Sequence, residues 1–272
     1  MSTDEQRNFS GFLKSSYLSK DCLIPGLENF QMPESIDEEC YPDLKENLML
    51  GKRAERYFSK SIELSDEYDM LLESIQVFKE KRTIGEFDFF VKRLSDNQLI
   101  HVELVYKFYL LKLNTGFAAA NWVGPNLNDS LELKVDKLQK KQFPLIKSEE
   151  GIRVLESHHL NPDHVLQQLA FFGNLFLPAS RRDIVHELYP EAIQGYWYTL
   201  NEFIQAQCSS CTYFIPTKID WFMQNPGGVD WLELDELLEM LQLLTDSKKS
   251  PMVWKNNPDG TVDRLFVVWW EP

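Results

Sequence analysis

The sequence predicts an α/β protein with one compact core, a mixed sheet flanked by helices, and a C-terminal α+β extension. Three strand-like segments follow one another between residues 71 and 111, with segments of helical spacing on both sides. Hydrophobic residues make up 43% of the 272 residues, enough apolar surface to offset the entropy of ordering the chain. We therefore expect an irregular arm over 1–47, a core over 48–180 and an extension over 181–272.

The first predicted elements lead from the arm into the sheet. Residues 1–47 mix turn formers with acids, and prolines interrupt any long element. From 45 to 64 the apolar residues follow helical spacing, which predicts a helix that carries Glu55. The segments that follow have the composition of strands, and a turn at Leu94–Asn97 joins the second to the third. The three strands of this meander are predicted over 71–79, 83–92 and 99–111.

Helices and strands alternate in the rest of the chain. Asn126–Asp129 offers N-cap residues to a helix that ends near Gln142, just before Pro144. A further helix is predicted over 162–170. The later predicted elements are a strand over 171–177, a helix over 199–207, a strand over 212–215, an acidic helix over 232–244, and strands over 252–255 and 264–270.

Two neighbouring strands of the meander place acidic side chains on one face. Side chains alternate along a strand, so Glu86 and Asp88 share a face, as do His101 and Glu103 in the next strand. A turn centred between residues 95 and 96 sets Asp88 directly across from Glu103, with Glu86 diagonal to Glu103. Like charges placed opposite one another are destabilising, so this cluster requires solvent, a proton or a cation.

Two interpretations of this acidic face remain open at this point. Mg²⁺ or Mn²⁺ bound by Asp88, Glu103 and Glu86 would satisfy the carboxylates, because these ions prefer oxygen ligands and can activate water. The face could equally be the solvated side of an antiparallel sheet. His101 lies on the same face, and we expect it to be a surface histidine.

Charge and composition bear on partners and location. The net charge of −14 opposes generic attraction to nucleic acid. Residues 219–246 hold seven acids and no Lys or Arg, which makes them a candidate protein-binding surface, whereas residues 130–147 hold five lysines against two acids. Apolar runs are too short for a membrane span, and the polar N-terminus lacks signal-peptide features, so a cytoplasmic location is expected. Cys208 and Cys211 have the spacing of half a zinc site without a second half, and free thiols are expected.

The acidic face belongs to a larger pattern. Thr83–Asp88 (TIGEFD), followed fifteen residues later by Glu103 and preceded by helical Glu55, resembles the PD-(D/E)xK superfamily of metal-dependent nucleases. These residues, together with 102–110 and Trp122–Asn126 (WVGPN), also resemble a bacterial family, domain of unknown function 1853, which is grouped with that superfamily. There the similarity extends towards the strand around Arg264–Val267.

The resemblance implies a restriction-endonuclease-like core and roles for particular residues. Asp88 and Glu103 would bind the metal, Glu55 would assist from its helix, and a lysine would position the attacking water. The superfamily places that lysine two residues after the glutamate, where this chain has Val105, and the nearest lysine is Lys107. Some branches use a glutamine in the following helix, a position that Gln142 could match.

Two functions follow as hypotheses. The first is a divalent-metal-dependent phosphodiesterase or nuclease acting on nucleic acid, with Glu55, Asp88, Glu103 and Lys107 in the catalytic roles. The second is a catalytically silent binding or assembly module with the same fold, which holds a protein partner through residues 219–246.

Overall fold

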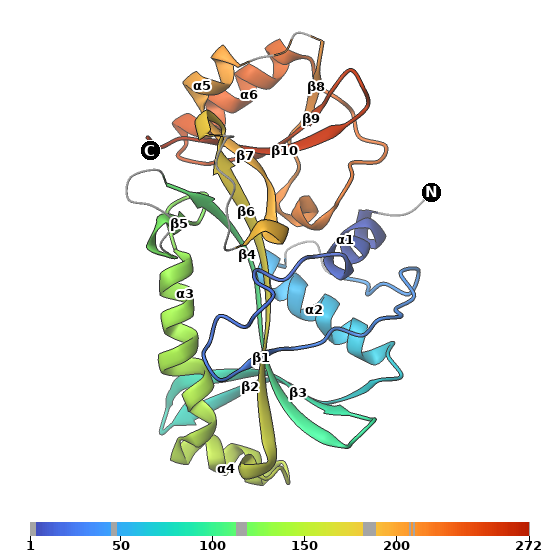
Figure 1. The fold of residues 1–272 in the computed structure, drawn as a ribbon, viewed down its shortest axis with the longest axis vertical. Helices are drawn as coiled ribbons and strands as arrows, with labels where there is room; N and C mark the ends of the chain where they lie inside the picture. The colour runs from blue at the N-terminus through green and yellow to red at the C-terminus, as the bar shows by residue number, and fades with distance from the viewer. Residues whose placement is uncertain are drawn as a thin grey trace. The chain divides into compact units, whose positions relative to one another are not determined.

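The protein is a mixed α/β structure with a large sheet flanked by helices (Figure 1). The structure is a computed structural model that describes residues 4–44, 48–112, 119–181, 189–206, 208 and 210–271. The strands of these residues form one ten-stranded mixed sheet with the order β2-β3-β4-β6-β7-β10-β9-β8, where β1 pairs with β6 and β5 with β4. The predicted α/β class is confirmed.

The described helices and strands have the following bounds. The helices are α1 Asp4–Leu13, α2 Leu50–Glu63, α3 Leu131–Lys137, α4 Glu149–Ser157, α5 Leu200–Gln205 and α6 Leu234–Asp246. The strands are β1 Glu28–Asn29, β2 Tyr68–Lys79, β3 Arg82–Arg93, β4 Gln98–Leu111, β5 Trp122–Val123, β6 Val165–Pro178, β7 Ile193–Thr199, β8 Thr212–Phe214, β9 Met252–Asn256 and β10 Val262–Val268.

The chain divides into two compact units. The first unit consists of Met1–Ser16, Lys107–Glu132 and Gly173–Pro272, and the second consists of Tyr17–Tyr106 and Leu133–Phe172. The long strands β4 and β6 therefore each contribute residues to both units. The division of the chain at 47 and 180 stays a prediction.

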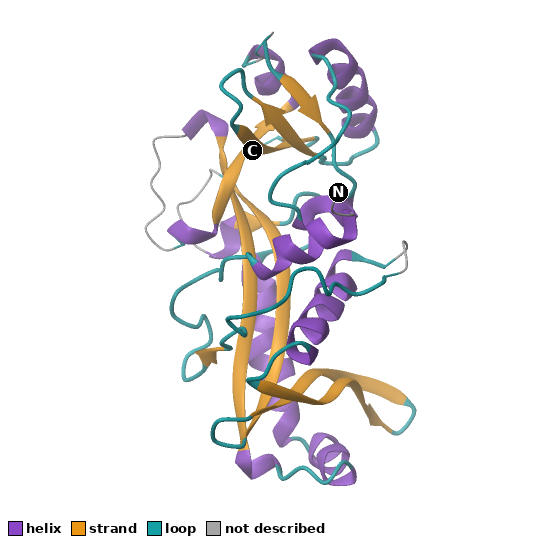
Figure 2. Ribbon diagram, turned by 90° about the vertical axis from the view of Figure 1, so that its right-hand side faces the viewer, coloured by secondary structure: helices purple, strands orange, loops and turns teal. Residues whose placement is uncertain are grey.

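In the second unit, the predicted meander forms as expected. Strand β2 pairs antiparallel with β3, and β3 pairs antiparallel with β4. Strand β6 lies beside β4 in the strand order, and Figure 2 shows these long strands running side by side. Figure 1 shows α2 on one side of β4 and β6 and α3 on the other. Helix α2 buries Ala54, Tyr57, Phe58 and Ile62, the stripe that its helical spacing predicts.

Burial of β4 on both faces corrects one expectation. The sequence suggested a polar face along this strand, yet the residues between Ile100 and Tyr106 are all buried. Covered on both sides, a strand buries polar and apolar side chains alike, and alternation along the sequence no longer reports exposure. The interpretation of this face as a solvated surface is therefore wrong.

Four further elements differ from the sequence-based expectations. The helix predicted over 162–170 is wrong: Pro162–His164 forms only a 3₁₀ turn, and Val165–Pro178 is strand β6. Its residues from Gln168 onward are buried, and β1 pairs with it in parallel, so sheet pairing overrides the local pattern that predicted a helix. Helices α1 and α4 and strand β7 were not expected.

The first unit carries the extension elements that the sequence predicts, which are α5, β8, α6, β9 and β10, together with the unexpected strand β7. Strands β7 and β10 pair in parallel, while β9 pairs antiparallel with both β10 and β8. Helices α5 and α6 pack on these strands around a buried cluster that includes Phe203, Tyr213, Leu237 and Leu241 (Figure 1). In the part of the chain that the structure describes, no helix is long and apolar enough to cross a membrane.

Candidate functional site

The β3–β4 hairpin brings Asp88 and Glu103 together, as its predicted register requires. The observed pairs run from Arg93↔Gln98 to Phe89↔Val102, and the same register continued by one residue sets Asp88 across from Glu103. At that point the Asp88 carboxylate accepts the Leu104 amide, with Oδ2 2.9 Å from the nitrogen. The side chain of Asp88 is therefore tied to the backbone of the strand that carries Glu103.

Burial changes the protonation of both carboxyl groups. The Glu103 side chain is 0% exposed, whereas Asp88 is partly exposed. Burial, with the neighbouring charge of Glu103 second, raises the pKa of Asp88 to about 7. Burial likewise raises the pKa of Glu103 well above its ordinary value, while the charge of Lys134 and a hydrogen bond with Asp88 act in the opposite direction. Near neutral pH the pair therefore retains a proton unless a cation replaces it.

His101 is a buried neighbour of this pair, which corrects the expectation of a surface histidine. Its ring contacts the rings of Phe87, Phe90 and Phe143, and its side chain is 0% exposed. Burial lowers the pKa of His101 to about 4, so the imidazole is neutral at physiological pH. Its contact with Glu103, at 3.1 Å between Nε2 and Oε1, is therefore not an ion pair.

Gln167 fixes the tautomer of His101. The Gln167 amide nitrogen lies 3.2 Å from Nδ1 of His101 and also donates to the carbonyl of Phe143 at 3.0 Å. Because an amide nitrogen only donates, Nδ1 is the acceptor and the ring proton of neutral His101 sits on Nε2, the atom beside Glu103.

Gln142 reaches Glu103 from the helical segment that follows α3. Its amide nitrogen donates to Oε2 of Glu103, while its carbonyl oxygen accepts from Nζ of Lys134 at 3.1 Å. Gln142 ends the π-helical turn Leu138–Gln142, and turns of this kind are frequent at functional sites. The structure thus places Gln142 beside Glu103.

Lys134 brings a positive charge to the pair, and the sequence reasoning missed it. Its charge lowers the pKa of Asp88 and of Glu103 against the effect of burial. The sequence did show the run of lysines over residues 130–147. The alternation of side chains along the strands does not indicate, however, which lysine of a helix comes close to the sheet. Lys107, by contrast, lies in the first unit, where its amine pairs with Asp129 at 2.6 Å.

Glu55 and Glu86 form a second acidic group bridged by Lys52. The Lys52 amine lies 2.6 Å from Oε2 of Glu55 and 3.2 Å from Oε1 of Glu86. Burial raises the pKa of Glu55, and the charges of Asp88 and Glu86 add smaller increases. The structure therefore brings Glu55 and Glu86 into the electrostatic surroundings of Asp88, with Lys52 balancing their charge.

The residues present suit a divalent cation held by two carboxylates. Among the described residues no group of three or more acidic, histidine or cysteine side chains is arranged to hold a metal, so Glu86 does not complete a three-residue site with Asp88 and Glu103. Mg²⁺ commonly takes only one or two carboxylates and completes its shell with water and phosphate oxygens. Oε1 of Glu103 is buried and lies 3.1 Å from Nε2 of His101 without the alignment of a hydrogen bond, so it can still act as an acceptor for such an ion.

Fold and site together define a mixed α/β protein with a buried acidic pair beside a basic helical segment. The family model described as domain of unknown function, DUF1853, matches residues 29–268. The chain belongs to this family, which confirms that part of the resemblance. No curated protein and no solved structure matches the chain.

Proposed function

We propose that the protein is a divalent-metal-dependent phosphodiesterase of the PD-(D/E)xK type that acts on nucleic acid. The observation that carries the proposal is the Asp88–Glu103 pair, whose raised pKa values and buried Glu103 oxygen suit a cation in place of a proton. The restriction-endonuclease-like core is part of the same proposal. The meander β2-β3-β4, preceded by helix α2, supports this assignment of the fold.

Each side chain around the Asp88–Glu103 pair has its own role in the proposed reaction. A bound Mg²⁺ or Mn²⁺ would activate water and offset charge on a phosphodiester. Asp88 and Glu103 would hold the ion, and Gln142 orients the Glu103 carboxylate by donating to Oε2. Lys134 replaces Lys107 in our assignment, because its amine belongs to the same hydrogen-bonded chain as Glu103 and can stabilise an anionic oxygen there.

The substrate class rests on the lysines that follow Lys134. Lys137, Lys140, Lys141 and Lys147 are exposed on the same helical segment, although Lys140 is paired with Asp136. Such a strip offers local attraction for phosphates on a protein whose net charge of −14 repels them elsewhere. Acidic surroundings would restrict binding to nucleic acid that reaches this strip.

Cleavage by the purified protein tests the proposal. A panel of single-stranded, duplex and branched DNA and RNA is incubated with Mg²⁺ or Mn²⁺, and Asp88→Asn serves as the inactive control. Lys134→Gln and Lys107→Gln form a matched pair, because both remove one amine. We expect Lys134→Gln to lose about 10²-fold or more in rate and Lys107→Gln to lose little. Absence of cleavage across the panel, or equal losses in the two lysine variants, would contradict this assignment.

The alternative is a catalytically silent binding module. The acids of α6 favour it: Asp235 and Glu239 are exposed beside exposed Met240 and Leu243, a mixed surface suited to a basic, partly apolar protein partner. Deleting 219–246 would remove the core residues Leu237 and Leu241, so Asp235→Lys with Glu239→Lys is the better probe. A stable co-purifying protein that this double variant loses, together with absence of cleavage, would favour the alternative.

A further inference from the structure

Cys208 and Cys211 lie close to each other between α5 and β8 in the first unit. The Cys211 amide donates to the Cys208 carbonyl at 3.2 Å. A backbone hydrogen bond from residue i+3 to residue i keeps the two Cα atoms within about 7 Å, close to the range that a disulfide needs. Cys211 is 1% exposed and Cys208 is partly exposed, so only Cys208 is open to a reagent.

The contacts of the two sulfurs make them unequal. Sγ of Cys208 lies 3.3 Å from Oγ of Ser210, which can donate to it, and also contacts the Cys211 thiol, whose proton has Oδ1 of Asn257 as a second acceptor at 3.8 Å. These contacts lower the pKa of Cys208 to about 7, and the charge of Lys255 adds to the effect. Burial and the bond to Cys208 raise the pKa of Cys211. Cys208 is therefore the more acidic of the two thiols.

The other two cysteines serve as internal references. Cys40 is more exposed than Cys208, but its thiol donates to Asp37 at 3.3 Å, and this carboxylate raises the pKa of Cys40. Burial raises the pKa of Cys22. Cys208 is therefore distinguished from the other cysteines by its polar contacts and not by its exposure.

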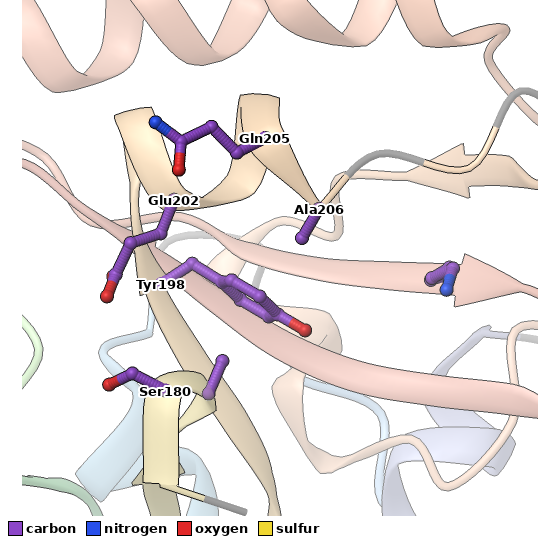
Figure 3. Close-up of a pocket in the computed structure, with 7 residues that line it drawn as sticks. Ser180, Tyr198, Glu202, Gln205 and Ala206 are labelled. Carbon is purple, nitrogen blue, oxygen red and sulfur yellow. The ribbon is translucent and has the colours of Figure 1, made fainter.

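A cavity adjoins the dithiol through Lys255. It has a volume of about 650 Å³ and is lined by residues of β7, α5 and β9, among them Tyr198, Glu202, Ala206 and Lys255. Figure 3 shows the ring of Tyr198 between Ser180 and the side chains of α5. Lys255 lines this space and also acts electrostatically on both sulfurs.

We propose that Cys208 and Cys211 form a redox-active dithiol that exchanges with a low-molecular-weight disulfide, with Cys208 attacking and Cys211 resolving. The Cys208 thiolate attacks one sulfur of the disulfide, forms a mixed disulfide and releases the other half as a thiolate that takes up a proton. Cys211 then gives up its proton and attacks the Cys208 sulfur, which releases the second half as a thiol. The two cysteines lose two electrons, and the small disulfide gains them as two thiols. This activity is independent of the proposed nuclease site.

Alkylation kinetics test the first step. The full-length protein is treated with iodoacetamide from pH 5.5 to 9, and modification of each cysteine is followed by peptide mass spectrometry. We expect Cys208 to react with a midpoint near pH 7 and severalfold faster than Cys40 at that pH, because more of it is thiolate. Lys255→Met should move the midpoint upward. A rate at Cys208 no greater than at Cys40 would overturn the proposal.

Oxidised glutathione tests the second step. The unmodified protein should form an internal Cys208–Cys211 disulfide, whereas Cys211→Ser should stop at a glutathione adduct on Cys208. Cys208→Ser should leave Cys211 unreacted because that thiol is buried. A glutathione adduct that persists on Cys208 of the unmodified protein would contradict a redox dithiol. So would zinc that the unmodified protein retains and that either substitution releases.

Discussion

Asp88 and Glu103 are carboxyl groups whose behaviour follows from where the hairpin places them. Each would titrate near pH 4 in an exposed position, yet burial raises the pKa of both. The neighbours of Glu103 are a neutral imidazole and an amide, so neither cancels its charge. Lys134 supplies a positive charge that opposes the effect of burial on the pKa of both groups.

The raised pKa of Asp88 predicts how stability changes with pH in the absence of metal. Between about pH 4 and 7 the folded protein keeps a proton on Asp88 that the unfolded chain releases, so the free energy of unfolding falls as pH rises through this window. Asp88→Asn removes this pH-dependent loss of stability, because the asparagine amide does not ionise and its oxygen can still accept a hydrogen bond from the Leu104 amide. With EDTA present, we expect the variant to match the unmodified protein at pH 5 and to exceed its stability by on the order of 1 to 3 kcal/mol at pH 8.

Urea unfolding at the two pH values measures the difference. A variant that is strongly destabilised at both would show that Asp88 has a purely structural hydrogen-bonding role.

At the scale of elements, the contacts of a few residues decide which strands and helices form the site. In the π-helical turn, the Phe143 amide bonds the Leu138 carbonyl, and the turn ends at Gln142, which reaches Glu103. In the first unit, strand β7 approaches β10 closely at Gly195. A Cβ atom there would lie 2.0 Å from the Arg264 carbonyl oxygen.

Gly195→Ala should therefore destabilise the protein. The backbone of β10 would have to move, and overpacking of this kind costs about 1 to 3 kcal/mol. Gly51→Ala in α2 is the matched control, since a Cβ there meets nothing within 4 Å and alanine favours helix. Thermal melts should show a lower Tm for Gly195→Ala and an unchanged or higher Tm for Gly51→Ala. Equal effects of the two substitutions would contradict the close approach of β7 and β10.

At the scale of the whole molecule, a net charge of −14 affects the binding of both candidate ligands, a divalent cation and a nucleic acid. It favours the cation and disfavours the nucleic acid. Local groups have to account for specificity in each case: the Asp88–Glu103 pair for the cation and the lysines after Lys134 for phosphates.

Cation binding should stabilise the whole fold by mass action. At a hundredfold excess of Mg²⁺ or Mn²⁺ over the dissociation constant, the gain is about 2.7 kcal/mol if only the folded state binds. Asp88→Asn should gain far less, so its stability advantage at pH 8 in EDTA should disappear or reverse in excess metal. Melts without any metal response would show that the carboxyl pair keeps its proton rather than exchanging it for an ion.

Nucleic-acid binding should be weak and steep in salt. If about four lysines replace counterions, the logarithm of the association constant should fall with that of the salt concentration with a slope of about −3. Lys137→Ala with Lys141→Ala should reduce the slope by about 1 to 2, whereas Lys81→Ala, an exposed lysine at the β2–β3 turn, should leave it unchanged. Titrations at several salt concentrations measure the slope. Equal effects of the variants would place binding elsewhere.

Local sequence patterns predict a large part of this structure. Alternation and turn chemistry predict the three strands of the meander and the register that opposes Asp88 and Glu103, because a side-chain period of two and a short turn leave few alternatives. Helical spacing predicts α2 with its buried stripe, and Glu55 on it. The same patterns fail where packing decides: residues 165–170 join strand β6, which is buried from Gln168 onward, although a helix was predicted there, because a strand covered on both faces satisfies its backbone and apolar side chains together.

The sequence by itself determined the α/β class, the hairpin register and the identity of the acidic pair. Only the tertiary structure decided that the pair is buried, that Lys134 and Gln142 reach it from a distant helix, and that His101 lies neutral beside it. The physical reason is that periodicity reports which side of an element a residue occupies, whereas burial and pKa depend on what other elements bring against that side.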